Sequence, residues 1–315
     1  MEHSNQTTSQ RFILLGLSTV HHLQVIFFVI FLIMYLVTIS WNLLLIIMVR
    51  TNPTLHNPMY FFLTNLSFID ICFSSSIVPV LLMNTLAKDT SISLFGCAAQ
   101  MYVSLTLGAT ECLILAVMAF DRFAAICKPL HYNTIMSRTL CFYLVALPWS
   151  VGLIDSFLQL YLTFQLPFCN NLNTNHYFCE VPAFIRMSCG DTFLNELSLY
   201  VSGGIIAGSA FCLIVISYVH IISKILKITS TQGRQKSFST CASHLTVVTL
   251  FYGTIMFMYL RPHSKNTQYS IETEKVVPIL YTTVTPMLNP FIYSIRNNDV
   301  KSALINQLKR KQCHF

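Results

Sequence analysis

Long apolar stretches alternate with short polar segments along almost the whole chain. A helix that crosses roughly 30 Å of hydrocarbon needs about 20 mostly apolar residues, and seven stretches meet this requirement. Because lipid offers the backbone no hydrogen-bond partners, each stretch must be helical. The pattern therefore predicts an all-α membrane protein, a seven-transmembrane helix bundle that forms one domain over residues 1–315. The predicted spans are about 25–48, 58–82, 97–119, 140–160, 198–222, 239–260 and 273–293.

Composition agrees with this pattern. Hydrophobic residues make up 54% of the chain and charged residues only 10%, and the mean hydropathy is +0.61. These values lie outside the range of a soluble globular domain. The chain also lacks a His-Glu-x-x-His metal motif, a Gly-rich phosphate loop and a nucleophile with an evident partner, so we do not expect an enzyme.

The distribution of basic residues predicts the orientation of the bundle, because positive side chains are retained on the cytoplasmic side. With the N-terminus outside, thirteen of the 19 Lys and Arg residues fall in the inner connections and the C-terminal tail. We therefore predict a plasma-membrane protein with an extracellular tail 1–24 and a cytoplasmic tail 294–315. Apolar residues at helical spacing in 294–310 predict a short amphipathic C-terminal helix. The net charge of +7 indicates contact with anionic lipid or a cytoplasmic partner rather than nucleic acid.

Features of the predicted outer side suit an oxidising, glycosylating compartment. Asn5-Gln6-Thr7 is a glycosylation acceptor in the outer tail. Four of the 11 cysteines also fall outside, where disulfides persist. Four cysteines allow three connectivities, and spacing does not choose among them. These cysteines are Cys97, Cys169, Cys179 and Cys189.

Three acidic residues fall inside predicted spans, where a charge costs about 2.5–3.5 kcal/mol at mid-depth. Glu111 lies ten residues before Asp121, about 15 Å along a helix, and Asp70 is expected near the same depth. Two such carboxylates repel each other, so we predict that Asp70 and Glu111 hold a monovalent cation or a proton. The alternative is that each is hydrogen-bonded separately. Asp155 can reach interfacial water and is assigned no role.

Four stretches together resemble the signatures of vertebrate olfactory receptors, a branch of the rhodopsin-like G-protein-coupled receptors. They are spread over the chain in the family's order. A short N-terminal tail and "FYG" at 251–253 resemble the class II group, while Phe120 and Phe123 stand where the family usually has Tyr. The four stretches are "LHNPMYFFL" at 55–63, "MAFDRFAAIC" at 118–127, "KSFSTCASHL" at 236–245 and "PMLNPFIYSIRN" at 286–297.

The resemblance implies a conformational switch on the cytoplasmic side. Asp121 would hold Arg122 while the receptor is inactive, and activation would release Arg122 toward the G protein. The alternative is an arginine that only anchors the helix end to lipid phosphates. Asn289 and Pro290, with Tyr293, resemble the hinge motif of the seventh helix, for which a static kink is the alternative. The other implied switch residues are Tyr218, which would meet the released arginine, and Ser239, Thr240 and His244 of the sixth helix, which would swing outward.

The resemblance also implies specific covalent and ionic features. It selects disulfides between Cys97 and Cys179 and between Cys169 and Cys189, although a pairing of Cys97 with Cys189 stays open. Asp70 and Glu111 match the acidic pair that lines a sodium-type pocket in the family. A sodium ion is therefore the cation that we expect between them.

A ligand site in such a bundle is expected between the helices toward the outer half. The lining that we predict is largely apolar, with hydroxyl groups but no ionised group. It favours a small neutral, hydrophobic molecule with one hydrogen-bonding function. Amines are disfavoured because Ser104 stands where an amine receptor would carry a carboxylate. By helical periodicity and carried-over position, the lining residues are Ser104, Leu105, Gly108, Ala109, Ser202, Ile206, Tyr252, Ile255, Met256, Tyr259, Ile279 and Thr282.

The resemblance implies an odorant receptor that binds a volatile ligand, activates a stimulatory, olfactory-type heterotrimeric G protein and raises cyclic AMP in the cilia of sensory neurons. Two alternatives remain. A transporter or channel could use Asp70 and Glu111 to relay ions or protons. A receptor of the same fold could instead serve a small molecule that is not an odorant.

Overall fold

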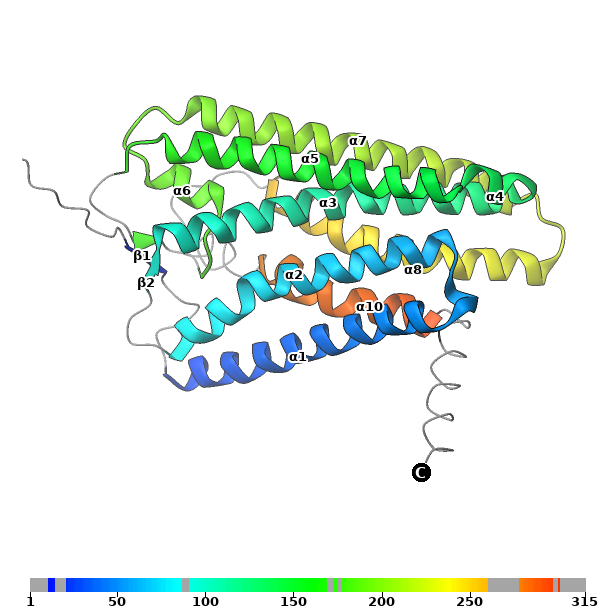
Figure 1. The fold of residues 1–315 in the computed structure, drawn as a ribbon, viewed down its shortest axis with the longest axis horizontal. Coiled ribbons are helices and arrows are strands. Elements are labelled where there is room, and N and C mark those ends of the chain that lie inside the picture. The colour runs from blue at the N-terminus through cyan, green and yellow to red at the C-terminus, as the bar shows by residue number, and fades with distance from the viewer. Residues whose placement is uncertain are drawn as a thin grey trace, which may run out of the picture.

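The protein is a bundle of long helices that run side by side, as a computed structural model shows (Figure 1). The structure describes residues 11–14, 21–86, 91–168, 173–174, 177–259, 278–296 and 300. The long helices are α1 (His21–Thr51), α2 (Pro58–Leu86), α3 (Leu94–Cys127), α5 (Arg138–Phe164), α7 (Phe193–Ile225) and α8 (Thr231–Tyr259). A π-helical turn, η3 (Leu280–Val284), leads into α10 (Thr285–Arg296). Shorter helices are η1 (Pro53–Leu55), η2 (Pro129–His131), α4 (Tyr132–Ile135) and α6 (Val181–Met187).

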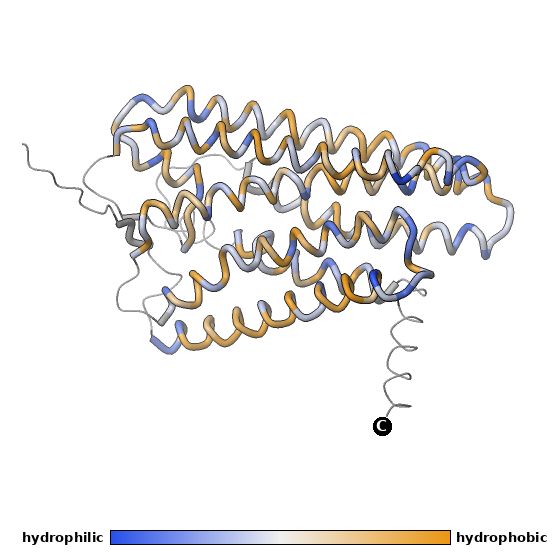
Figure 2. Tube along the Cα trace, viewed as in Figure 1, coloured by the Kyte–Doolittle hydropathy of each residue, from blue (hydrophilic) through white to orange (hydrophobic). Residues whose placement is uncertain are grey.

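Hydrophobic residues follow the helices and hydrophilic residues gather mainly at their ends (Figure 2). Within the described residues, five helices are long and apolar enough to cross a membrane, namely α1, α2, α3, α5 and α7. The sixth predicted span corresponds to α8, whose first turns are polar. The seventh corresponds to η3 and α10, and its predicted start at 273–277 lies outside the described residues.

Most of the helices extend beyond the predicted membrane spans, which stay predictions of where the chain crosses the hydrocarbon. Helix α3 begins at Leu94 and continues to Cys127, whereas the apolar stretch covers 97–119. Only residues 226–230 separate α7 from α8, although 223–238 was left between the predicted spans. Hydropathy marks the hydrocarbon layer, but Lys, Arg, Gln and Ser residues continue a helix into water once the preceding turns exist.

Helix α3 lies in the middle of the bundle and packs against α2, α5 and α7. The Ser93 side chain begins it by accepting a hydrogen bond from the Gly96 amide (3.1 Å). Gly152 of α5 lies so close to α3 that an added Cβ would stand 2.7 Å from the carbonyl oxygen of Thr106. Glycine at this crossing therefore sets how closely the two helices approach.

A small sheet and a disulfide organise the end of the bundle where the outer loops meet (Figure 1). Strand β1 (Arg11–Leu14) pairs antiparallel with β2 (Ser91–Ser93) and parallel with β3 (Asn173–Thr174), in the order β2-β1-β3. The hydropathy pattern did not predict this sheet, because its strands are only two to four residues long. Strand β3 and α6 give the long connection after α5 a defined structure, as its cysteines and aromatic residues suggested.

The disulfide joins Cys97 to Cys179, which confirms this pairing and excludes the alternative with Cys189. Cys189 is itself disulfide-bonded, and Cys169, its predicted partner, lies outside the described residues. The predicted glycosylation site Asn5 and most of the predicted amphipathic helix 294–310 also lie outside them. Both stay predictions.

Candidate functional site

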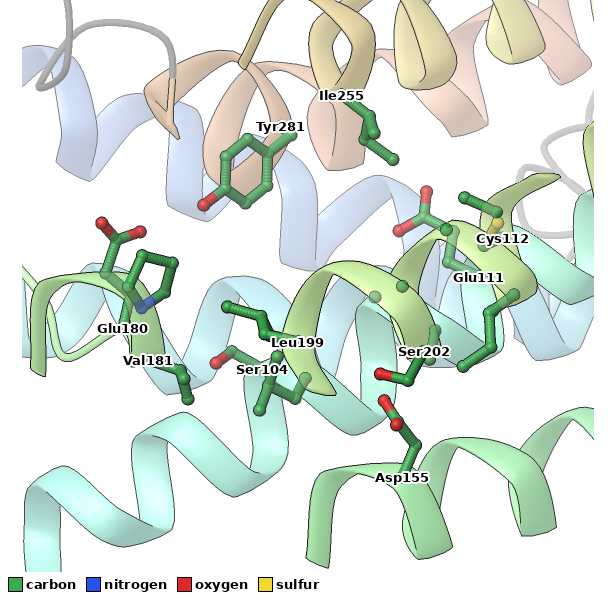
Figure 3. Close-up of a pocket in the computed structure, with 18 of the residues that line it drawn as sticks. Ser104, Glu111, Cys112, Asp155, Glu180, Val181, Leu199, Ser202, Ile255 and Tyr281 are labelled. Atoms are coloured by element: carbon green, nitrogen blue, oxygen red, sulfur yellow. The ribbon is translucent and has the colours of Figure 1, made fainter. Parts of the chain in front are cut away.

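A cavity of about 500 Å³ opens between α3, α7 and α8 on the side of the bundle that carries α6 (Figure 3). Its volume is typical of sites for small organic molecules. Eight of the twelve predicted lining residues surround this one cavity. They are Ser104, Leu105, Gly108 and Ala109 of α3, Ser202 and Ile206 of α7, and Ile255 and Met256 of α8. Helical periodicity selected the residues of α3, and the family resemblance those of α7 and α8, while the role of these residues in binding stays a prediction.

Three predicted residues do not line the cavity. Tyr252 lies one turn deeper than Ile255, and its hydroxyl is 3.0 Å from the Cys112 sulfur. Thr282 is buried and donates to the Pro278 carbonyl oxygen (2.7 Å), and Ile279 is also absent from the wall. Tyr281, which lies within the π turn η3, lines the cavity instead. The side chain of Tyr259, the twelfth residue, lies outside the described part of the structure.

The prediction that the lining carries no ionised group was wrong. Asp155 of α5, Glu111 of α3 and Glu180 of the outer loop all contribute to the wall. The sequence had singled out Asp155 and Glu111 as intramembrane acids, which was the available signal. Glu180 directly follows Cys179, so the disulfide between Cys179 and Cys97 fixes Glu180 over the bundle. There its Oε1 atom lies 3.8 Å from Nη2 of Arg186. The argument against amines, which rested on Ser104 alone, therefore fails.

Backbone rather than side chains forms much of the cavity wall on α7. Gly203, Gly204 and Gly208 line the cavity, as does Gly108 across from them on α3. A Cβ added at any of these four positions would meet nothing within 4 Å. The glycines therefore widen the cavity instead of allowing a close helix contact, unlike Gly152.

A polar cluster lies below the cavity between α2, α3 and α10. The Asn289 side-chain nitrogen donates to both carboxylate oxygens of Asp70, at 3.1 Å each. Asp70 also interacts electrostatically with Glu111, so the two predicted acids do come together. Within this cluster the buried oxygens Glu111 Oε1 and Asn289 Oδ1 find no hydrogen-bond partner in the described residues, and neither does Ser74 Oγ, one turn along α2 from Asp70. Oxygen atoms are the ligands that hard cations prefer, so these residues fit a sodium ion.

The predicted latch between Asp121 and Arg122 is not formed. In the described part of the chain no ion pair joins the two side chains, and Asp121 instead accepts a hydrogen bond from the Tyr132 hydroxyl (2.8 Å). The Arg122 guanidinium contacts the sulfur of Met59. Adjacent residues of a helix do not face each other, so each side chain takes a partner on its own side. Burial, with the Asp121 carboxylate adding to it, raises the pKa of Tyr132, which keeps its hydroxyl a donor.

A hydrogen-bond chain joins α7, α8 and α3 on the inner side of the polar cluster. Tyr218 of α7 is hydrogen-bonded to His244 Nδ1 (2.8 Å), and His244 Nε2 lies 3.0 Å from the Leu115 carbonyl oxygen. Since a carbonyl oxygen only accepts, Nε2 carries the hydrogen. Tyr218 therefore meets His244 in this structure, and its contact with the released Arg122 stays a prediction.

The remaining predicted switch residues are distributed along α8 and α10. Tyr293 is buried near this chain, and Pro290 lies inside α10, where it interrupts the backbone hydrogen bonding. Ser239 is exposed, and the side chain of Thr240 lies outside the described residues. The structure thus brings His244 and Tyr218 together but leaves Ser239 at the surface.

The amino-acid sequence is similar to those of known olfactory receptors over nearly its whole length. Residues 31–311 match the family model described as "Olfactory receptor". The chain is 48% identical to the dog "Olfactory receptor-like protein OLF3" (96% of each chain covered), 47% to human "Olfactory receptor 5M8" (98% of each) and 45% to mouse "Olfactory receptor 5AR1" (99% of each). The seven-helix bundle and the four sequence signatures agree with this match. Members of this family are seven-transmembrane receptors of the cell membrane and are not enzymes. The chain therefore belongs to the olfactory receptor family, and within it to the class II group.

Proposed function

We propose that this receptor binds a small, largely apolar volatile molecule in the cavity between α3, α7 and α8, and that binding activates a stimulatory, olfactory-type G protein and raises cyclic AMP. The observation that carries the proposal is the cavity itself. It is of small-molecule size, its wall is mostly apolar, and Val181 and Pro182 of α6 line it on the outer side. Olfactory sensory cilia are the expected location.

Contacts that run from the cavity to the inner side support a route for activation. Ile255 lines the cavity, and Tyr252, one turn deeper on the same helix, contacts Cys112 of α3. About two turns beyond Tyr252 along α8, His244 is bound to α3 and α7. A ligand that displaces Ile255 would shift α8 as a unit, because a helix is rigid over this length. The hydrogen bonds of His244 would then open next to Arg122.

Replacement of Arg122 by alanine tests the coupling. In cells that express the receptor with an olfactory-type G protein, we expect a screen of volatile compounds to give agonists that raise cyclic AMP. Arg122→Ala should abolish this response, because the buried guanidinium beside Tyr218 and His244 is lost, while the amount of receptor on the cell surface persists. Arg138→Ala, which removes an exposed basic residue at the inner end of α5, is the control and should respond normally. A response unchanged in Arg122→Ala, or ion flux without G protein, would instead favour a transporter or channel.

We also propose that Asp70 and Glu111 hold a sodium ion together with Asn289. A ligand that binds only the folded state stabilises it, so sodium should raise the melting temperature of the purified receptor above that in choline. Glu111→Gln removes a charged ligand and should abolish most of this difference. Glu196→Gln, on the exposed side of α7, is the matched control. An equal sodium effect in all three proteins would favour carboxyl groups that are hydrogen-bonded separately.

A further inference from the structure

Asp155 is a carboxylate inside the bundle for which the described residues supply no partner. It lies in the outer half of α5, is half-buried and lines the cavity. It makes no hydrogen bond or ion pair with any described residue. A charged group at this depth is costly unless something compensates it. The cavity is the place from which such compensation can come.

The surroundings of Asp155 form a polar patch on an otherwise apolar wall. Figure 3 shows its carboxylate directed toward the hydroxyl of Ser202 on α7. Gln159, one turn along α5 and 1% exposed, donates its side-chain N–H to Ser202 (2.9 Å) and to Ser198 (3.1 Å). These bonds use the Ser202 oxygen as an acceptor and leave its hydrogen free to donate. Asp155 and Ser202 thus present one strong acceptor and one hydroxyl to the cavity, and Gln159 holds the Ser202 side chain in place.

The other polar side chains of the wall are the hydroxyls of Ser104, Tyr200 and Tyr281, the thiol of Cys112 and the carboxyl groups of Glu111 and Glu180. At the floor of the cavity Glu111 is 3% exposed and its Oε1 has no hydrogen-bond partner in the described residues. No Lys, Arg or His of the described residues lines the wall. A carboxylic acid would therefore find no cation here, and a ligand whose only polar atom accepts hydrogen bonds would leave Asp155 uncompensated. A ligand that donates would satisfy it, since hydrogen bonds to charged groups are the strong ones.

We propose that Asp155, positioned beside Ser202, is the polar anchor of the ligand site and selects molecules whose head group donates a hydrogen bond, that is, alcohols and primary amines. This inference rests on the proposed function and narrows it. The alkyl part of such a molecule would lie against the glycine wall of α7, where Gly203, Gly204 and Gly208 leave space. Aldehydes, ketones, esters and carboxylic acids of the same skeleton would bind more weakly.

A matched series of head groups tests the proposal. The probes are octanol, octylamine, octanal and octanoic acid, followed by the same four head groups on phenylethyl and cyclohexyl skeletons and on the skeleton of any agonist from the volatile screen. For each skeleton that activates the wild-type receptor, we expect the alcohol or the amine to be roughly tenfold or more potent than the aldehyde, and the acid to be inactive. An aldehyde or acid as the most potent member would overturn the proposal.

Variants then separate the two donor classes. Asp155→Ala should weaken the alcohol and the amine by roughly ten- to hundredfold and leave the aldehyde unchanged, which also serves as the test of folding. Asp155→Asn keeps an acceptor but loses the charge, so it should affect the amine much more than the alcohol. Glu196→Gln should change nothing. Equal shifts for all head groups in Asp155→Ala would contradict the anchor role. A receptor that reaches the surface and answers no volatile compound would count against the proposed function instead.

Discussion

Replacing Gly152 with alanine is expected to remove most of the receptor from the cell surface. The new Cβ would stand 2.6 Å from Thr110 Oγ1 and 2.7 Å from the Thr106 carbonyl oxygen, closer than carbon atoms approach such groups. The second neighbour is backbone of α3, so no side-chain rotation relieves the overlap and the two helices must separate. Overpacking of this kind typically costs about 1–3 kcal/mol, which is a large part of the net stability of a protein.

The measurement is the ratio of surface to total receptor, together with the melting temperature of the purified protein. Gly204→Ala is the matched control, because the same methyl group meets nothing within 4 Å there. It should reach the surface in normal amounts. Equal surface levels for the two variants would show that the contact between α3 and α5 does not depend on Gly152.

Loss of the disulfide between Cys97 and Cys179 is expected to have the second large effect. The bond joins residues 82 positions apart, and bonds that close long loops typically contribute about 2–4 kcal/mol. Hydrogen bonds beside the disulfide attach the same segment to the bundle a second time. The amide of Cys179 donates to Gln100 (2.9 Å), which in turn donates to the Ser76 carbonyl oxygen of α2 (2.7 Å). The segment that carries Glu180, and after it the residues that cover the cavity, is therefore held to both α3 and α2.

Cys97→Ser, Cys179→Ser and the double variant should all show the same strong loss of surface receptor and of odorant response. Equal effects are expected because either single change breaks the same bond. Cys212→Ser is the control, since Cys212 is an exposed free cysteine on α7. A normal odorant response in the double variant would mean that the hydrogen bonds of Gln100 suffice to hold the loop.

The candidate site was predicted well where it depends on one helix at a time. Ser104 and Gly108 share a face of α3 by periodicity alone, and both line the cavity. The prediction failed where the position of a side chain depends on more than the periodicity of its own helix. Tyr281 rather than Thr282 lines the cavity, and both residues lie in the π turn η3. Asp121 accepts a hydrogen bond from Tyr132 because a separate short helix, α4, brings that hydroxyl within 2.8 Å. Nothing in the periodicity of a single segment reports either arrangement.

The sequence by itself determined which segments are helical, that they belong in a membrane, and to which family the signatures assign them. Each of these properties follows from the residues of one segment and the solvent around it. Only the tertiary structure decided that Asp155 faces the cavity without a partner among the described residues, that His244 joins three helices, and that Gly152 lies in a close helix contact while Gly204 borders open space. The physical reason is that the rotation and separation of packed helices depend on side chains from segments far apart in the chain, which close packing fixes only when all of them are together.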